Sequence, residues 1–144
     1  MATPFTDIYD RAIFRFADYD FLKQDIETRE GVLEHFLMSA KTDFKRICRI
    51  DLDDCDFVNK QFNQTLDDES IEILALGIAF YWLSQKTLDS KALKNMLNSK
   101  DYYYYSPANL LKEVQRLRET VHTDFKSKMR EYSYIGNNIK DLKN

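Results

Sequence analysis

A single apolar stripe runs through the last third of the sequence and predicts its longest element. Apart from the adjacent Leu110 and Leu111, its members lie three or four positions apart, which is the spacing of one face of an α-helix: Leu110, Leu111, Val114, Leu117, Val121, Phe125 and Met129. Ser106 predicts the N-cap and Pro107 the first helical position, where its missing N–H costs nothing. The stripe predicts an end near Tyr132. A helix of roughly 26 residues is about 39 Å long, so we expect one end to project.

Earlier stretches of the chain have the same helical periodicity, over residues 5–16, 28–47 and 65–83, and a shorter apolar face predicts a helix over residues 90–98. The third stretch is apolar on most sides, so we expect it to be the central helix. Thr65 and Asp68 have the spacing of a capping box at its start. Gly77 in its middle costs about 1 kcal/mol relative to alanine, and we expect a neighbouring helix to approach closely there. Residues 57–64 have no clear pattern.

Glycine and proline are scarce, with three and two respectively in 144 residues. An all-β sandwich needs frequent turn residues, so this scarcity favours helices. We therefore predict an all-α fold, a helical bundle of four to five helices with a long C-terminal helix. Residues 1–132 would form a single domain, and the polar residues 133–144 a flexible tail.

The charges of the chain are interleaved and nearly cancel, to a net charge of −3. Solvated helix faces explain this pattern, including local basic pairs such as Lys45 with Arg46 and Arg116 with Arg118, so a phosphate-binding domain is not favoured. The first residues lack the features of a signal peptide, and the longest apolar stretch is too short for a bilayer, so we expect no membrane association. Cys48 and Cys55 are expected to be reduced thiols.

Catalytic and metal sites find no support in the sequence. His35 and His122 lie on different predicted helices, and we expect ordinary surface or boundary histidines. The acidic run at residues 51–56 resembles the start of a calcium loop, but Cys55, Asp56 and Phe62 occupy positions that need an oxygen ligand, a glycine and a glutamate. A solvated loop is the favoured interpretation. No nucleotide-binding motif occurs, so we expect a protein that is not an enzyme and has no cofactor.

Aromatic and aliphatic side chains in two segments are candidate interface residues, because tyrosine is enriched at protein contacts and a loose end can order on a partner. They are Tyr102, Tyr103, Tyr104 and Tyr105 in the first, and Tyr134, Ile135, Ile139 and Leu142 in the second. Alternatives remain open for both. Two of the four consecutive rings could pack inward and two lie at the surface, and the second segment could be a disordered end.

Several stretches resemble a family of small proteins encoded by phages and prophages of Gram-positive bacteria. These are residues 5–9, 18–22, 67–77, 99–102, 106–110 and 132–134. The family is similar in helical layout to head–tail connector (adaptor, neck) proteins, which form a ring under the portal and carry DNA through a central channel. The resemblance implies a virion protein assembled in the host cytoplasm, with copies of itself, the portal and other connector or tail proteins as partners.

Two alternatives to the connector stay open. The protein could occupy another position in the virion, such as a tail-completion or baseplate site. It could instead be a small phage regulator that binds a host protein or DNA. A DNA-binding regulator should carry a basic recognition helix, and residues 90–98 offer only Lys91 and Lys94 with Lys100 nearby.

Overall fold

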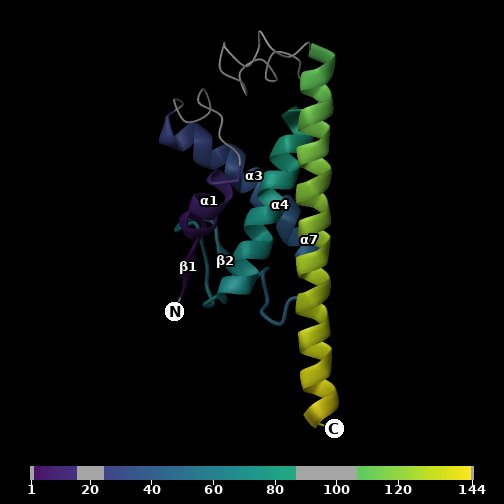
Figure 1. Cartoon of the computed structure of the whole chain (residues 1–144). Helices are drawn as coiled ribbons and strands as arrows, with labels where there is room; N and C mark the ends of the chain where they lie inside the picture. Colours follow the sequence, from purple (N-terminus) through teal and green to yellow (C-terminus); the bar gives the residue numbers. More distant parts are fainter. Residues whose placement is uncertain (1, 16–24, 87–106, 144) are drawn as a thin grey trace.

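The computed structural model describes residues 2–15, 25–86 and 107–143, which form four helices and three short strands (Figure 1). In chain order the elements are β1 (Thr3–Pro4), α1 (Phe5–Ile13), α3 (Ile26–Phe44), β2 (Cys55–Asp56), β3 (Gln61–Phe62), α4 (Asp68–Lys86) and α7 (Pro107–Lys143). The chain is predominantly helical, as predicted, and it also has three two-residue strands that were not predicted. The helix predicted over residues 90–98 lies outside the described residues.

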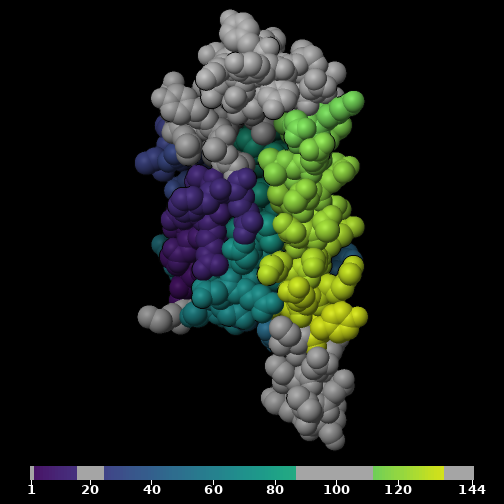
Figure 2. All heavy atoms as spheres, in the orientation of Figure 1, coloured from purple at the N-terminus to yellow at the C-terminus, as the bar shows by residue number. Residues whose placement is uncertain are grey.

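Helix α4 is the centre of the molecule, as its apolar sequence predicted. It packs against α1, α3 and α7, and the space-filling view shows α7 covering one flank of this body (Figure 2). Trp82 and Leu83 near its end are almost fully buried, as is every residue from Ile73 to Ala79. Burial on nearly all sides explains why α4 lacks the polar face of a surface helix.

Gly77 lies where α3 and α7 both cross α4. A Cβ atom added there would overlap the Cβ of Ala40 on α3, and it would lie 3.1 Å from Cζ of Phe125 on α7. The close approach predicted at this glycine is therefore confirmed. The missing side chain allows three helices to meet at one point.

The starts of α3 and α4 are each capped by an aspartate. The Asp25 side chain accepts a hydrogen bond from the Thr28 N–H at 3.3 Å, and the Asp67 side chain accepts one from the Ser70 N–H at 2.8 Å. These bonds satisfy backbone donors that have no partner within the helix. The capping box predicted for Thr65 and Asp68 was wrong, because α4 begins later and Asp67 occupies the capping position.

The unassigned residues 57–64 belong to a small antiparallel sheet with strand order β1-β3-β2. Thr3 and Cys55 both pair with Phe62. The Asp56 side chain accepts hydrogen bonds from the Val58 and Asn59 N–H groups at 2.8 and 3.1 Å, which closes the turn between β2 and β3. The sheet therefore joins the N-terminal strand to the middle of the chain.

Helix α7 passes its predicted end at Tyr132 and runs to Lys143, so the stretch predicted as a tail is helical. The buried residues of α7 lie almost on one line along the helix, because Val121, Phe125 and Tyr132 follow Val114 by 7, 11 and 18 positions. Leu117 was predicted to be in the core but is 41% exposed, because it lies about 60° away from that line at 100° per residue. No helix among the described residues is long and apolar enough to cross a membrane.

Candidate functional site: a groove between α3 and α7

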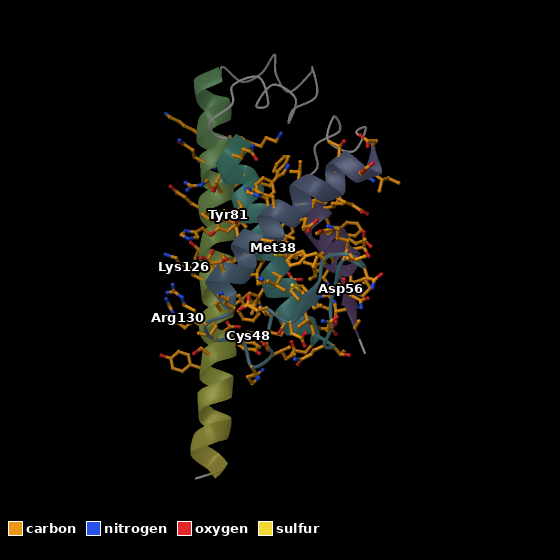
Figure 3. All side chains as sticks on the ribbon, turned by 180° about the vertical axis from the view of Figure 1, so that it is seen from behind. Met38, Cys48, Asp56, Tyr81, Lys126 and Arg130 are labelled. Carbon is orange, nitrogen blue, oxygen red and sulfur yellow. The ribbon has the colours of Figure 1, made fainter. Side chains whose placement is uncertain are left out.

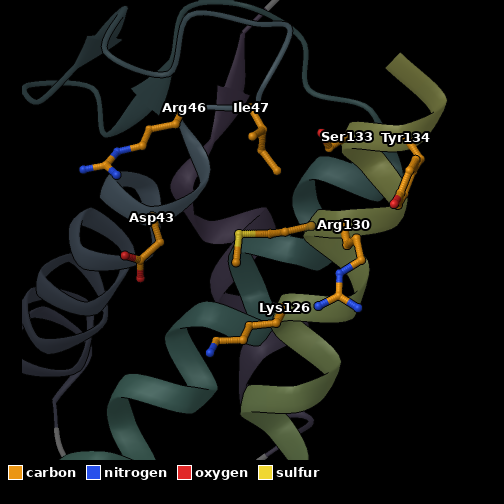
Figure 4. Close-up of a pocket in the computed structure, with 8 residues that line it drawn as sticks. Asp43, Arg46, Ile47, Lys126, Arg130, Ser133 and Tyr134 are labelled. Carbon is orange, nitrogen blue, oxygen red and sulfur yellow. The ribbon is translucent and has the colours of Figure 1, made fainter. Parts of the chain in front are cut away.

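A groove of about 620 Å³ lies between the C-terminal end of α3 and residues 126–134 of α7 (Figure 4). Its walls carry charged and apolar side chains from both segments: Asp43, Arg46, Ile47, Lys126, Met129, Arg130, Ser133 and Tyr134. The α7 residues follow positions i, i+3, i+4, i+7 and i+8, which form one face of a helix. This face lies beside the line of α7 residues that packs on the body.

Tyr132 fixes the two walls of the groove relative to each other. Its ring packs edge-on against Phe44, with ring centroids 5.0 Å apart, and the Arg49 guanidinium lies 4.1 Å above the ring centroid. Its hydroxyl accepts a hydrogen bond from the Arg49 N–H at 3.0 Å. Burial raises the pKa of Tyr132, so the phenol stays neutral. Because Phe44 ends α3, this cluster holds the following residues Arg46 and Ile47 next to α7.

Basic side chains recur at every fourth position of α7, at Arg118, His122, Lys126 and Arg130. The His122 ring stacks on Phe80 of α4, with centroids 4.3 Å apart. Arg118 donates a hydrogen bond from Nε to Ser84 Oγ at 2.8 Å. Burial lowers the pKa of His122, and the charges of Lys126 and Arg118 lower it further. Residues four apart are neighbours on a helix surface, so the four side chains form a row along α7 whose last two members, Lys126 and Arg130, line the groove.

Asp43 is the acid in the groove wall, and its carboxylate already has a partner. It accepts a hydrogen bond from the Tyr81 hydroxyl of α4. Burial, followed by this hydrogen bond, raises the pKa of Tyr81 to about 12. Tyr81 therefore remains the donor at neutral pH and holds Asp43 against the body.

The side chains that line the groove offer charges and apolar surface to a ligand. Ser133, its one hydroxyl-bearing residue besides Tyr134, has no histidine among the groove residues to act as a base. Within the described ranges, no three histidine, cysteine or acidic residues lie close enough to hold a metal ion. Cations around an apolar floor can instead pair with an anionic group of another molecule.

Comparisons of the chain with models of protein families, with curated proteins and with solved structures found no match.

The structure places only part of the predicted interface. Tyr134 lines the groove and is 63% exposed. Ile135, Ile139 and Leu142 lie on the last turns of α7, where the backbone alone is described. Tyr102, Tyr103, Tyr104 and Tyr105 lie outside the described residues.

Sequence reasoning missed the groove, although two clues were available. Arg46 belonged to a basic pair that was assigned to an ordinary solvated face. The four-residue spacing of Arg118, His122, Lys126 and Arg130 was also readable, but it lies beside the apolar stripe that drew the helix prediction. His35 is exposed and His122 half-buried, as predicted for surface or boundary histidines.

The acidic run contributes to local structure. Asp53 pairs with Lys41 at 3.1 Å and with Lys45 at 3.5 Å, and these contacts lower its pKa. Asp54 accepts a hydrogen bond from the Asn63 side chain at 2.9 Å. These acids therefore connect the sheet to α3.

Proposed function

We propose that the protein is a non-enzymatic structural subunit of a tailed-phage virion, which assembles into a ring at the head–tail junction beneath the portal. The observation that carries the proposal is the length of α7. Its described buried residues end at Tyr132, yet the helix continues to Lys143 and extends past the rest of the body in Figure 1. A helix that leaves its own domain offers a surface to another chain.

The distribution of charge on the body also supports a ring. Closed rings of identical subunits need two different patches on each copy, one of which contacts the other patch on the neighbour. Lys126 and Arg130 lie at one edge of the molecule, and Asp56 of the acidic segment lies at the opposite edge (Figure 3). A basic pair at one edge and a carboxylate at the other favour head-to-tail contact between copies.

The position beneath the portal comes from the resemblance of the sequence to phage virion proteins. Portal and capsid genes upstream, with tail genes downstream, would support this position. A gene placed among regulatory genes would contradict it.

The experiment is a truncation after Tyr134, compared with the full chain. We expect the truncated protein to keep its melting temperature within a few degrees, because the buried part of α7 is intact, and to lose most of its binding to the portal ring of the same phage. Co-sedimentation with the purified portal measures the binding, and thermal unfolding checks the fold. Equal binding by both proteins would contradict the role given to α7. Recovery of the full chain in tail or baseplate fractions of virions would contradict the connector position.

A further inference from the structure

The groove brings together three cations that lack acidic partners, whereas several cations elsewhere on the body have them. Lys60 pairs with Glu34 at 2.9 Å, and Arg11 pairs with Asp68 at 3.0 Å. Within the described part of the chain, the three groove cations make no ion pair: Arg46, Lys126 and Arg130. The groove therefore has three charges available to a ligand.

Two of these cations also repel each other while they have no anionic partner. Lys126 and Arg130 are four residues apart on α7, and like charges at this spacing destabilise a helix by about 0.2–0.5 kcal/mol per pair. Asp43, the nearby acid, is held by the Tyr81 hydroxyl. An anionic ligand in the groove would relieve this repulsion.

The groove also has apolar surface that a ligand must cover. Ile47 and Met129 line it and are only partly buried against the core. Methionine adapts its shape to different partners and is common at binding surfaces that accept several shapes. Tyr134 adds an exposed aromatic ring at the rim. A ligand that fills this groove must bring apolar groups as well as negative charge.

We propose that the groove between α3 and α7 binds an acidic amphipathic segment of a partner protein. Its carboxylates pair with Arg46, Lys126 and Arg130, and its apolar side chains pack on Ile47 and Met129. The inference rests on the proposed function in one respect, which is that the occupant is a protein. Nucleic acid is the less suitable anion, because the chain as a whole carries a net charge of −3 and would repel a polyanion at long range.

The test measures the binding of a fluorescein-labelled helical peptide, with glutamates on one face and leucines on the other, to the full chain by fluorescence anisotropy. The groove variant is Lys126→Glu with Arg130→Glu. The matched control is Lys112→Glu with Lys128→Glu, which makes the same change in net charge on the same helix at exposed residues that do not line the groove. Melting temperatures check that both variants fold.

We expect the groove variant to weaken binding by at least about tenfold and the control by less than about threefold, because only the first removes direct partners of the peptide. A peptide with glutamine in place of each glutamate should bind more weakly. Equal weakening by the two variants, equal binding of the glutamine peptide, or no binding of the acidic peptide would overturn the proposal. Tighter binding of a DNA duplex that is lost in the same groove variant would also overturn it, in favour of nucleic acid.

Peptide binding is measured without any virion protein, so it separates the two proposals. A groove variant that loses the peptide but still co-sediments with the portal would leave both proposals standing, with the groove serving a different partner. A chain that binds the peptide as expected but never binds the portal would overturn the connector position alone.

Discussion

Gly77 is the position at which the packing of the three large helices can be tested with one methyl group. An added Cβ would overlap Ala40 on α3 and press on Phe125 of α7. We expect Gly77→Ala to lower the free energy of unfolding by about 1–3 kcal/mol, because overpacking in a core costs more than alanine gains in helix propensity. Urea denaturation measures the change.

Gly31 provides the matched control, since it also lies inside a helix. Its added Cβ would meet no atom within 4 Å, so Gly31→Ala should raise the free energy of unfolding by about 0.5–1 kcal/mol. Opposite signs at the two glycines are the expected result. A stabilising Gly77→Ala would show that α3 and α7 do not meet at this point.

His122 predicts how stability depends on pH. Burial against Phe80 and the nearby charges of Lys126 and Arg118 lower its pKa below 6.5, and Asp43 only partly opposes them. The unfolded chain therefore binds a proton more readily than the folded protein, so stability is complete above pH 6.5 and falls as the pH drops towards the folded pKa. Denaturant unfolding from about pH 8 to about pH 5.5 measures the loss. His122→Phe keeps a ring beside Phe80 and should flatten this part of the profile, whereas an unchanged slope would contradict the assignment.

At the scale of elements, α4 is the helix on which the others depend. Trp82 is 1% exposed, so we expect Trp82→Ala to lower the free energy of unfolding by about 3–5 kcal/mol through lost contacts and a cavity. Phe14→Ala removes an aromatic ring that is 91% exposed and should change stability by less than about 0.5 kcal/mol. Chemical denaturation measures both variants. A loss below roughly 1 kcal/mol for Trp82→Ala would contradict the assignment of α4 as the central, buried helix.

Elements with a long periodic pattern could be predicted, and those set by distant partners could not. The apolar residues of α4 and the stripe of α7 identified both helices. Strands β1 and β3 have two residues each, too few for an alternating pattern, and they form because Thr3 meets Phe62 in the folded chain. The end of α7 was placed too early because Gly136, Asn137 and Asn138 have low helix propensity.

The groove could not be predicted from the sequence, because its residues come together only in the folded molecule. Arg46 and Lys126 are far apart in sequence, and the packing of Phe44 against Tyr132 brings their segments together. Phe44 lies within the helix predicted over residues 28–47, and the long helix was predicted to end near Tyr132, but no sequence pattern pairs these two residues. Tyr134 was the one predicted interface residue whose side chain the structure places in the groove.

The whole molecule is longer than a compact chain of its size. A compact chain of 144 residues has a radius of gyration of about 14–15 Å, which for a sphere corresponds to a diameter of about 37 Å. The 37 residues of α7 span about 55 Å. Small-angle X-ray scattering of the monomer should therefore give a maximum dimension of at least about 55 Å. Truncation after Tyr134 should shorten it by roughly 13 Å. An unchanged maximum dimension would contradict a continuous helix.

The position of α7 after α4 in the chain has a consequence for synthesis. When α4 leaves the ribosome, α1 and α3 can cover only part of it, and the side around Gly77 that receives Phe125 remains in water. At about 5–20 residues per second, α7 follows a few seconds later. During that interval the nascent chain exposes its most apolar helix, which is the kind of surface that chaperones bind and that aggregation begins from. The yield of folded protein therefore depends on how promptly the last third of the chain is delivered.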